Sequence, residues 1–127
     1  MSQNTNTFPT NTPALDHERL DVYQCALDFH ATVLQMLPRR GFRALRDQLE
    51  RASMGVALNI AEGAGRTSAP DKRRFYEMAR GSVTESAAVM DLFRIRRLID
   101  ASQHQAARVL AVRLAQMLSR LCSPPRG

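Results

Sequence analysis

Apolar side chains recur at helical spacing in several segments of the chain. In residues 20–37 they gather on one broad face that includes Phe29, while polar side chains such as Asp28 fall opposite at about 100° per residue. The spacing predicts an amphipathic helix. We expect it to stop near Pro38, because proline does not continue a helix.

A second helix is predicted over residues 42–62, with Leu49 and Val56 in its inward stripe. Beyond Arg51 the outward face of this helix also becomes apolar, so we expect its second half to pack against other residues on both sides. The glycines in residues 63–65 are typical of a helix end at which a residue adopts a positive φ.

Two further helices are predicted from their start signals. In residues 68–71 (SAPD) the serine is a cap, proline suits the first turn, and the aspartate resembles a capping box; this helix extends to about Leu98. Residues 100–103 (DASQ) start the fourth helix in a similar way. Its expected buried positions are Ala106, Ala107, Leu110, Leu114, Met117, Leu118 and Leu121. Short connections between these helices predict an all-α fold, an antiparallel up-down four-helix bundle.

The two ends of the chain lack this periodicity. Residues 1–15 are rich in Asn, Thr and Pro and are expected to be a disordered arm, and residues 123–127 a disordered tail. The bundle is expected to occupy residues 16–122. The N-terminus does not resemble a signal peptide, and no apolar run approaches the roughly 18 residues of a membrane span. We therefore expect a cytoplasmic protein that does not bind membranes.

Positive charge is concentrated after the first predicted helix. The net charge is +6 overall, with −3 in residues 1–38 and +9 in residues 39–127, and 17 of the 18 basic residues are arginine. Such a surface attracts polyanions, and arginine suits bidentate contacts to phosphate. The same composition is equally expected of a GC-rich genome, so charge alone does not decide between a functional and a merely solvated face.

The sequence offers no recognisable catalytic constellation. His17, His30 and His104 lack metal-ligand spacing, and His30 lies on the apolar face, where a hydrogen-bonded core histidine is expected. Cys25 and Cys122 are interpreted as small buried or idle thiols. We expect no enzymatic activity, no metal and no cofactor.

Several blocks of sequence together resemble a known protein family. They are residues 20–24 (LDVYQ), 49–53 (LERAS), 59–66 (NIAEGAGR), 74–75 (RF) and 80–85 (RGSVTE). In content and order they resemble the four-helix-bundle family encoded in intervening sequences of large-subunit (23S) ribosomal RNA genes, which is related to the accessory variability determinant of diversity-generating retroelements. The resemblance implies an antiparallel bundle, a homopentameric ring, nucleic-acid association through basic surfaces and no enzymatic activity.

The predicted structural residues of these blocks are Asn59, Glu62, Arg80 and Glu85. Two carboxylates can act as acid and base, but no substrate-positioning set accompanies them. We expect instead that Glu62 and Glu85 each pair with an arginine, Arg66 or Arg80, to fix helix register. Breaking such a pair would cost roughly 3–5 kcal/mol if it is buried.

The arginines are the remaining candidates for function. The predicted nucleic-acid-binding residues are Arg39, Arg40, Arg43, Arg46, Arg66, Arg73, Arg96, Arg97, Arg113 and Arg120. Only Phe42 and Tyr76 lie near them in sequence, so phosphate-directed binding of structured RNA is favoured over base stacking. The alternative function is a protein-interaction scaffold that does not bind nucleic acid.

Apolar residues outside the inward stripes predict self-assembly. Met54 and Leu58 on the second helix, and Ala88, Leu92 and Ile95 on the third, would be exposed in a lone bundle. Contiguous exposed apolar surface usually marks an interface. Two different surfaces that meet head to tail generate a ring when the rotation closes.

Overall fold

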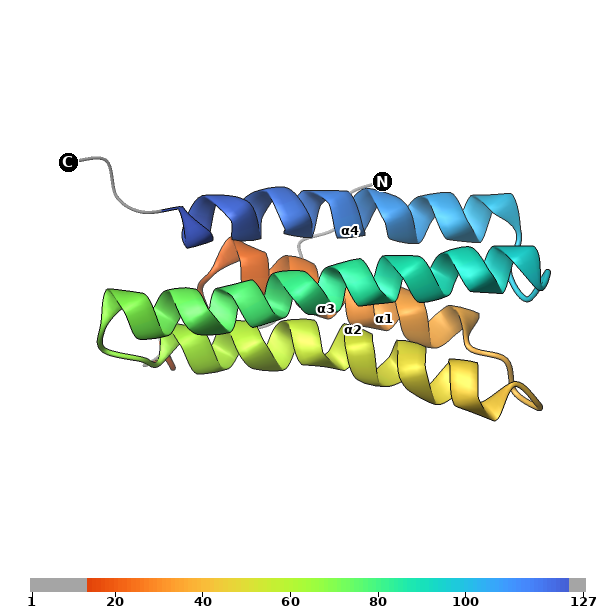
Figure 1. Cartoon of the computed structure of the whole chain (residues 1–127), viewed down its shortest axis with the longest axis horizontal. Helices are drawn as coiled ribbons and strands as arrows, with labels where there is room; N and C mark the ends of the chain where they lie inside the picture. The colour runs from red at the N-terminus through yellow and green to blue at the C-terminus, as the bar shows by residue number, and fades with distance from the viewer. Residues whose placement is uncertain (1–13, 124–127) are drawn as a thin grey trace.

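The computed structural model describes residues 14–123, which form a bundle of four helices (Figure 1). The helices are α1 (Asp21–Met36), α2 (Arg43–Ala64), α3 (Ala69–Ile95) and α4 (Ala101–Cys122). This confirms the predicted all-α class. The predicted arm and tail lie almost wholly outside the described residues. Within residues 14–123, none of the four helices is long and apolar enough to cross a bilayer.

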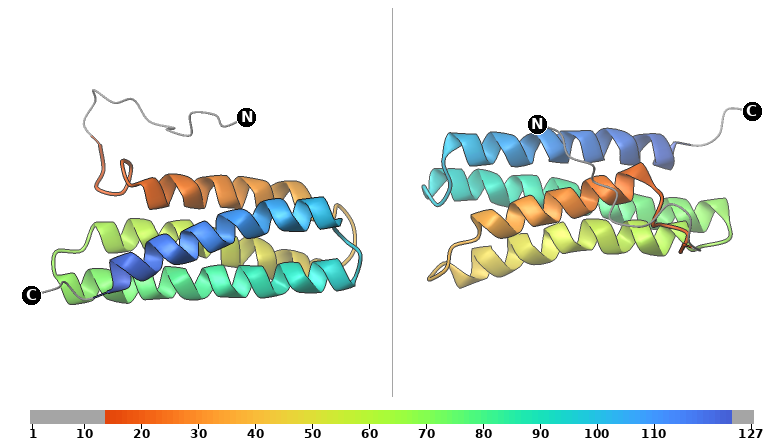
Figure 2. Two further views of the ribbon diagram at one scale, coloured as in Figure 1. Left: turned by 90° about the horizontal axis from the view of Figure 1, so that it is seen from above. Right: turned by 180° about the vertical axis from the view of Figure 1, so that it is seen from behind.

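Each helix packs against its neighbours in sequence, and α4 closes the bundle by packing against α1 (Figure 2). The most extensive seam joins α2 to α3. Among the described residues the diagonal pairs, α1 with α3 and α2 with α4, do not meet. The α1–α2 pair and the α3–α4 pair therefore form opposite sides of the bundle.

The helix boundaries have local causes. Leu37 is extended and ends α1, because a residue that precedes a proline is disfavoured in the helical region. The Ser68 hydroxyl accepts a hydrogen bond from the Asp71 amide and caps α3. The predicted capping box of α4 is also formed: the Asp100 carboxylate accepts from the Gln103 amide at 2.8 Å, and the Gln103 side chain accepts from the Asp100 amide at 2.9 Å.

The core contains the inward stripes predicted for the helices. Its largest fully buried side chains are Phe29, Val33, Leu49, Val56, Ile60, Met90, Phe93, Leu114 and Leu118. Ser53 and Ser86 are the polar members, and both hydroxyls are satisfied. The Ser53 hydroxyl donates to the Glu50 carbonyl and lies 2.8 Å from Nδ1 of His30, which confirms the expected hydrogen-bonded histidine.

The predicted buried face of α4 is wrong at two positions. Ala106 is exposed, and Leu121 is 43% exposed. The buried stripe instead contains Ala111 and Cys122. Successive helical residues are turned by about 100°, so Ala106 points away from the buried stripe of α4 that contains Ala107.

The prediction for residues 63–65 is also wrong in its physical reason. Helix α2 continues through Ala64, and neither Gly63 nor Gly65 has a positive φ. Gly63 instead permits close packing of α2 on α3. A Cβ atom at this position would lie 2.9 Å from Cε1 of Tyr76 and 3.1 Å from the Cβ of Phe75.

We expect Gly63→Ala to lower the free energy of unfolding by about 1–2 kcal/mol. Overpacking against the buried Tyr76 ring outweighs the roughly 1 kcal/mol that alanine gains over glycine in a helix. Gly81→Ala is the matched control: a Cβ there meets no atom within 4 Å, so stability should rise by about 0.5–1 kcal/mol. Urea unfolding followed by circular dichroism at one protein concentration measures both, and equal effects would contradict the packing account.

Candidate nucleic-acid interface

Two loops that are far apart in sequence meet at one end of the bundle. The α1–α2 connection and the α3–α4 connection both lie at the right of Figure 1, while the α2–α3 connection lies at the left. The arginines of this end, called the basic end below, are Arg39, Arg40, Arg43, Arg46, Arg94, Arg96 and Arg97. The fold thus joins two groups of arginines that are separate in the sequence.

Both loops of the basic end contain a non-glycine residue in the left-handed region. Gly41 has φ 73° and the following Phe42 has φ 52°; in the other loop Arg97 has φ 59°. For a residue with a Cβ this conformation costs roughly 1–2 kcal/mol. The Phe42 carbonyl nevertheless accepts from the Arg46 amide at 2.9 Å, so Phe42 starts the hydrogen-bond ladder of α2.

Most guanidinium groups of the basic end are accessible and weakly engaged. Arg39, Arg40 and Arg97 are exposed and make no ion pair within the described residues. The Arg43 side chain is 93% exposed and its Nε lies 3.9 Å from Asp47. The Arg96 guanidinium lies over the ring of Phe42, 6.0 Å from its centroid.

Two arginines of the basic end are hydrogen-bonded within the fold or partly buried. Arg94 donates to the Ile99 carbonyl at 3.3 Å and thereby braces the α3–α4 connection. Arg46 is partly buried, and its Nε is inaccessible and has no hydrogen-bond partner among the described residues.

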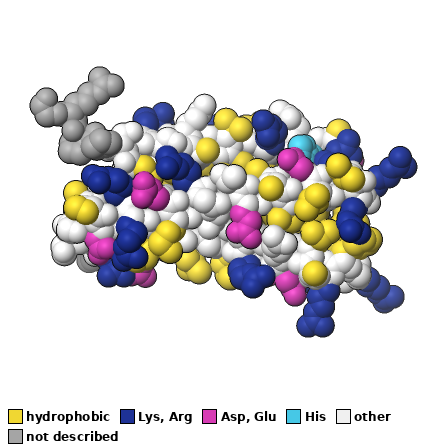
Figure 3. All heavy atoms as spheres, in the orientation of Figure 1, with side chains coloured by type: hydrophobic (Ala, Val, Ile, Leu, Met, Phe, Trp, Pro, Cys, Tyr) yellow, Lys and Arg dark blue, Asp and Glu magenta, His cyan; other side chains and the backbone are white. Residues whose placement is uncertain are grey.

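Three acidic residues near the basic end are already occupied. Asp47 faces Arg43, the Asp91 carboxylate accepts a hydrogen bond from Nε2 of His104 at 2.8 Å, and Asp100 caps α4. The other arginines of the basic end therefore have no acidic partner within the described residues. Figure 3 shows Lys and Arg side chains projecting from this end, at the right of the view.

Three cations around the α2–α3 connection, at the end called the compensated end below, are neutralised or tied to the fold. Arg66 and Arg74 lie over the ring of Phe75, 4.6 Å and 4.4 Å from its centroid, and Arg74 pairs with Asp71 at 3.1 Å. Lys72 donates to the Ala64 carbonyl at 2.8 Å. Positive and negative side chains lie next to one another at the left of Figure 3. Arg73 and Arg120 also lie at this end and make no ion pair within the described residues, so the compensation there is partial.

The predicted binding residues do not all belong to one surface. Arg66 and Arg73 lie at the compensated end, and Arg73 is partly buried. Arg113 and Arg120 are exposed but lie farther along α4, away from its start at the basic end. The other six predicted arginines lie together at the basic end. Sequence spacing alone gave no signal for this division.

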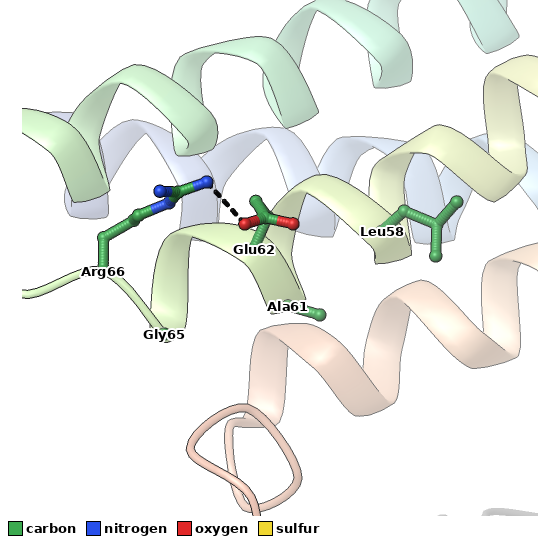
Figure 4. A pocket seen from close by; sticks show the side chains of 5 residues that line it. All are labelled: Leu58, Ala61, Glu62, Gly65 and Arg66. Atoms are coloured by element: carbon green, nitrogen blue, oxygen red, sulfur yellow. Dashed lines mark hydrogen bonds and ion pairs between the residues drawn. The ribbon is translucent and has the colours of Figure 1, made fainter.

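The predicted buried carboxylate–arginine pairs need correction. Arg66 does pair with Glu62, at 2.6 Å, but the two side chains are 39% and 52% exposed (Figure 4). Such a surface pair contributes below about 1 kcal/mol, rather than the 3–5 kcal/mol expected for a buried pair. Together with Leu58, Ala61 and Gly65 the pair lines a shallow, open depression of about 500 Å³.

The remaining motif residues are not paired as predicted. Glu85 is exposed and makes no ion pair within the described residues, so its predicted arginine partner is wrong. Arg80 instead donates to Oγ of Ser119 at 3.4 Å and links α3 to α4. The Asn59 side chain donates to the Gly55 carbonyl one turn earlier at 2.9 Å.

The cysteines have the environment expected of unreactive thiols. Cys25 and Cys122 are both free and buried, and burial raises the pKa of each thiol above its ordinary value. A raised pKa reduces the thiolate fraction at neutral pH. Within residues 14–123 no group of three or more His, Cys, Asp or Glu side chains is arranged to hold a metal ion.

Comparison with known proteins identifies a family and a fold. The model of the family described as 23S rRNA-intervening sequence protein matches residues 18–120. The crystal structure of a protein of unknown function from the S23 ribosomal protein family of Bacteroides thetaiotaomicron superposes with a TM-score of 0.75 at 17% identity, covering 81% of this chain and 99% of that chain. At that identity the similarity supports the fold alone. The comparison with curated proteins gives no match.

Proposed function

The chain belongs to the 23S rRNA-intervening sequence protein family, and from that premise we propose that it is a non-enzymatic, oligomeric protein that binds structured RNA through the basic end of its bundle. The observation that supports this proposal is the meeting of two arginine-bearing loops at one end, where nearby acids are already engaged.

The chemistry of the basic end suits phosphate better than base edges. Guanidinium groups bind phosphate oxygens in a bidentate manner and remain charged at all physiological pH values. The arginines lie in two short loops and at helix ends, and within residues 14–123 no helix or strand projects from the bundle to enter a groove. Binding is therefore directed at backbone shape and charge, with little reading of paired sequence.

Two exposed apolar surfaces support the oligomeric part of the proposal. The α2 surface consists of Met54 and Leu58, which are 43% and 61% exposed. The α3 surface consists of Ala88, Leu92 and Ile95, and the last two are 48% and 80% exposed. Apolar surface of this extent on a small bundle is typical of an interface.

The α2 surface and the α3 surface are two different surfaces on adjacent helices. The α2 surface adjoins α1, because neighbouring Ser53 bonds His30 of α1. The α3 surface adjoins α4, because Asp91, within the same stretch of α3, bonds His104 of α4. Contact between two different surfaces of successive copies is heterologous and gives a closed ring when the rotation permits. Five copies is the number that the family resemblance implies.

A ring would also strengthen RNA binding. Cyclic symmetry places every copy of the basic end at the same height along the ring axis. Several weak phosphate contacts on one RNA molecule then act together, because binding by one copy raises the effective concentration of RNA at the next.

A salt titration of wild-type binding to a structured RNA tests the proposal. If four to seven arginines contact phosphate, the slope of log K against log salt should be about −3 to −6, since each contact contributes 0.7–0.9. Unrelated RNA sequences of equal secondary structure should bind about equally. Absence of binding to any RNA at low salt would reject this function and favour the protein-interaction scaffold.

A further inference from the structure

Phe42 stands out among the residues of the basic end. Its side chain is 45% exposed and lies outside the hydrophobic core cluster. Although Phe42 belongs to the α1–α2 connection, the guanidinium of Arg96, from the other loop, lies 6.0 Å from its ring centroid. An aromatic ring is thus held open to solvent at the meeting point of the two arginine-bearing loops.

Neither the backbone nor the core accounts for a phenyl ring at this position. The φ of 52° at Phe42 is in the left-handed region, which glycine and asparagine adopt with less strain. Gly41, with φ 73°, immediately precedes it, so the loop already contains one residue suited to that region. A strained, half-exposed ring among cations is more readily explained by a ligand than by folding.

We infer that Phe42 is a stacking platform for an unpaired base, so that the RNA bound at the basic end is recognised at a single-stranded loop or bulge. The inference rests on the proposed function and specifies its partner. Every base offers a π-face to an aromatic ring, whereas bases inside a duplex are covered on both faces by their neighbours. The adjacent guanidinium groups would hold the phosphates that flank the stacked base.

The other aromatic residues near arginines lack this arrangement. Phe75 is covered by two guanidinium groups, from Arg66 and Arg74, and Asp71 holds Arg74 in place. Tyr76 is buried at 7% exposure. Among these three rings, Phe42 alone combines an open ring with uncompensated positive charge.

The first test compares two RNA hairpins with the same stem and the same number of phosphates. One has a loop of unpaired adenosines and the other has abasic riboses in the loop. We expect wild type to bind the adenosine loop roughly tenfold more tightly. Phe42→Leu, which keeps charge and apolar character, should remove that difference, and Phe42→Tyr should preserve it. Thermal melting followed by circular dichroism checks that each variant folds.

A second test uses the absence of tryptophan from the sequence. Phe42→Trp introduces a single indole, and stacking of an adenine on it should quench its fluorescence when the adenosine-loop hairpin is added. Met78→Trp places a single indole at another exposed position, 47% exposed on α3, and should show no quenching. This reporter works even if Phe42→Leu does not fold.

The outcomes separate the inference from the proposed function. If wild type binds both hairpins equally, or if Phe42→Leu weakens both equally, the stacking platform is rejected while phosphate binding at the basic end stands. If wild type binds neither hairpin at low salt, the proposed function and the inference are both rejected. Quenching of the Met78→Trp control to the same extent as Phe42→Trp would also reject the platform.

Discussion

Reversing one charge in each loop of the basic end, by Arg40→Glu with Arg97→Glu, should weaken RNA binding about a hundredfold at low salt. Both side chains are exposed and make no ion pair within residues 14–123, so the fold does not depend on them. Each lost charge-assisted contact is worth about 1.5 kcal/mol or more, and two such losses give this factor. The slope of log K against log salt should fall by about 1.4–1.8.

The matched control is Arg113→Glu with Arg120→Glu. It changes the net charge by the same amount, and both positions are exposed, but they lie on α4 away from the two loops. We expect binding to weaken only a few-fold, through the general reduction in positive potential. Fluorescence anisotropy with one structured RNA measures both double variants. An equal loss of affinity in the two would mean that net charge alone, and no particular end, determines binding.

The second large effect concerns assembly: Leu58→Glu with Leu92→Glu should convert the proposed oligomer into a monomer of 14.2 kDa. The two positions are 61% and 48% exposed in the single bundle, so a glutamate is hydrated there and the fold survives. In an assembled ring the same carboxylates would be buried without partners, at a cost of several kcal/mol per interface. Light scattering measures the mass of each species.

Met78→Glu is the control for this experiment, because Met78 is 47% exposed but belongs to neither the α2 surface nor the α3 surface. That variant should assemble like wild type. A wild type that is itself monomeric ends the proposal of a ring. A double variant that still assembles shows that other surfaces form the contact, and loss of assembly in Met78→Glu would show that the interface extends over a different part of α3.

The helices were predictable because their determinants are local. Periodic apolar residues specify the inward stripe of α2 through Leu49 and Val56, and the cap of α4 needs only Asp100 and Gln103. Each of these features depends on residues within a few turns of one another, so the sequence displays them directly. The antiparallel arrangement then follows from the short connections.

Features that depend on two helices were not predictable in the same way. The role of Gly63 depends on where α3 places Tyr76, which no local pattern reveals. The exposure of Glu62 depends on which side of α2 faces solvent near its end. Likewise the basic end exists only because the fold brings Arg40 and Arg97 to the same end of the bundle. The sequence shows Phe42 near arginines of its own loop, but only the fold brings Arg96 of the other loop over its ring.

The concentration of arginine at one end also affects the protein when no RNA is present. Like charges gathered in two short loops repel one another, and added salt screens that repulsion, so higher ionic strength should favour the folded bundle. The same salt weakens the attraction between the basic end and phosphate. Ionic strength therefore acts in opposite directions on the free protein and on its RNA complex, and the arginines that promote binding are also a source of instability until a polyanion neutralises them.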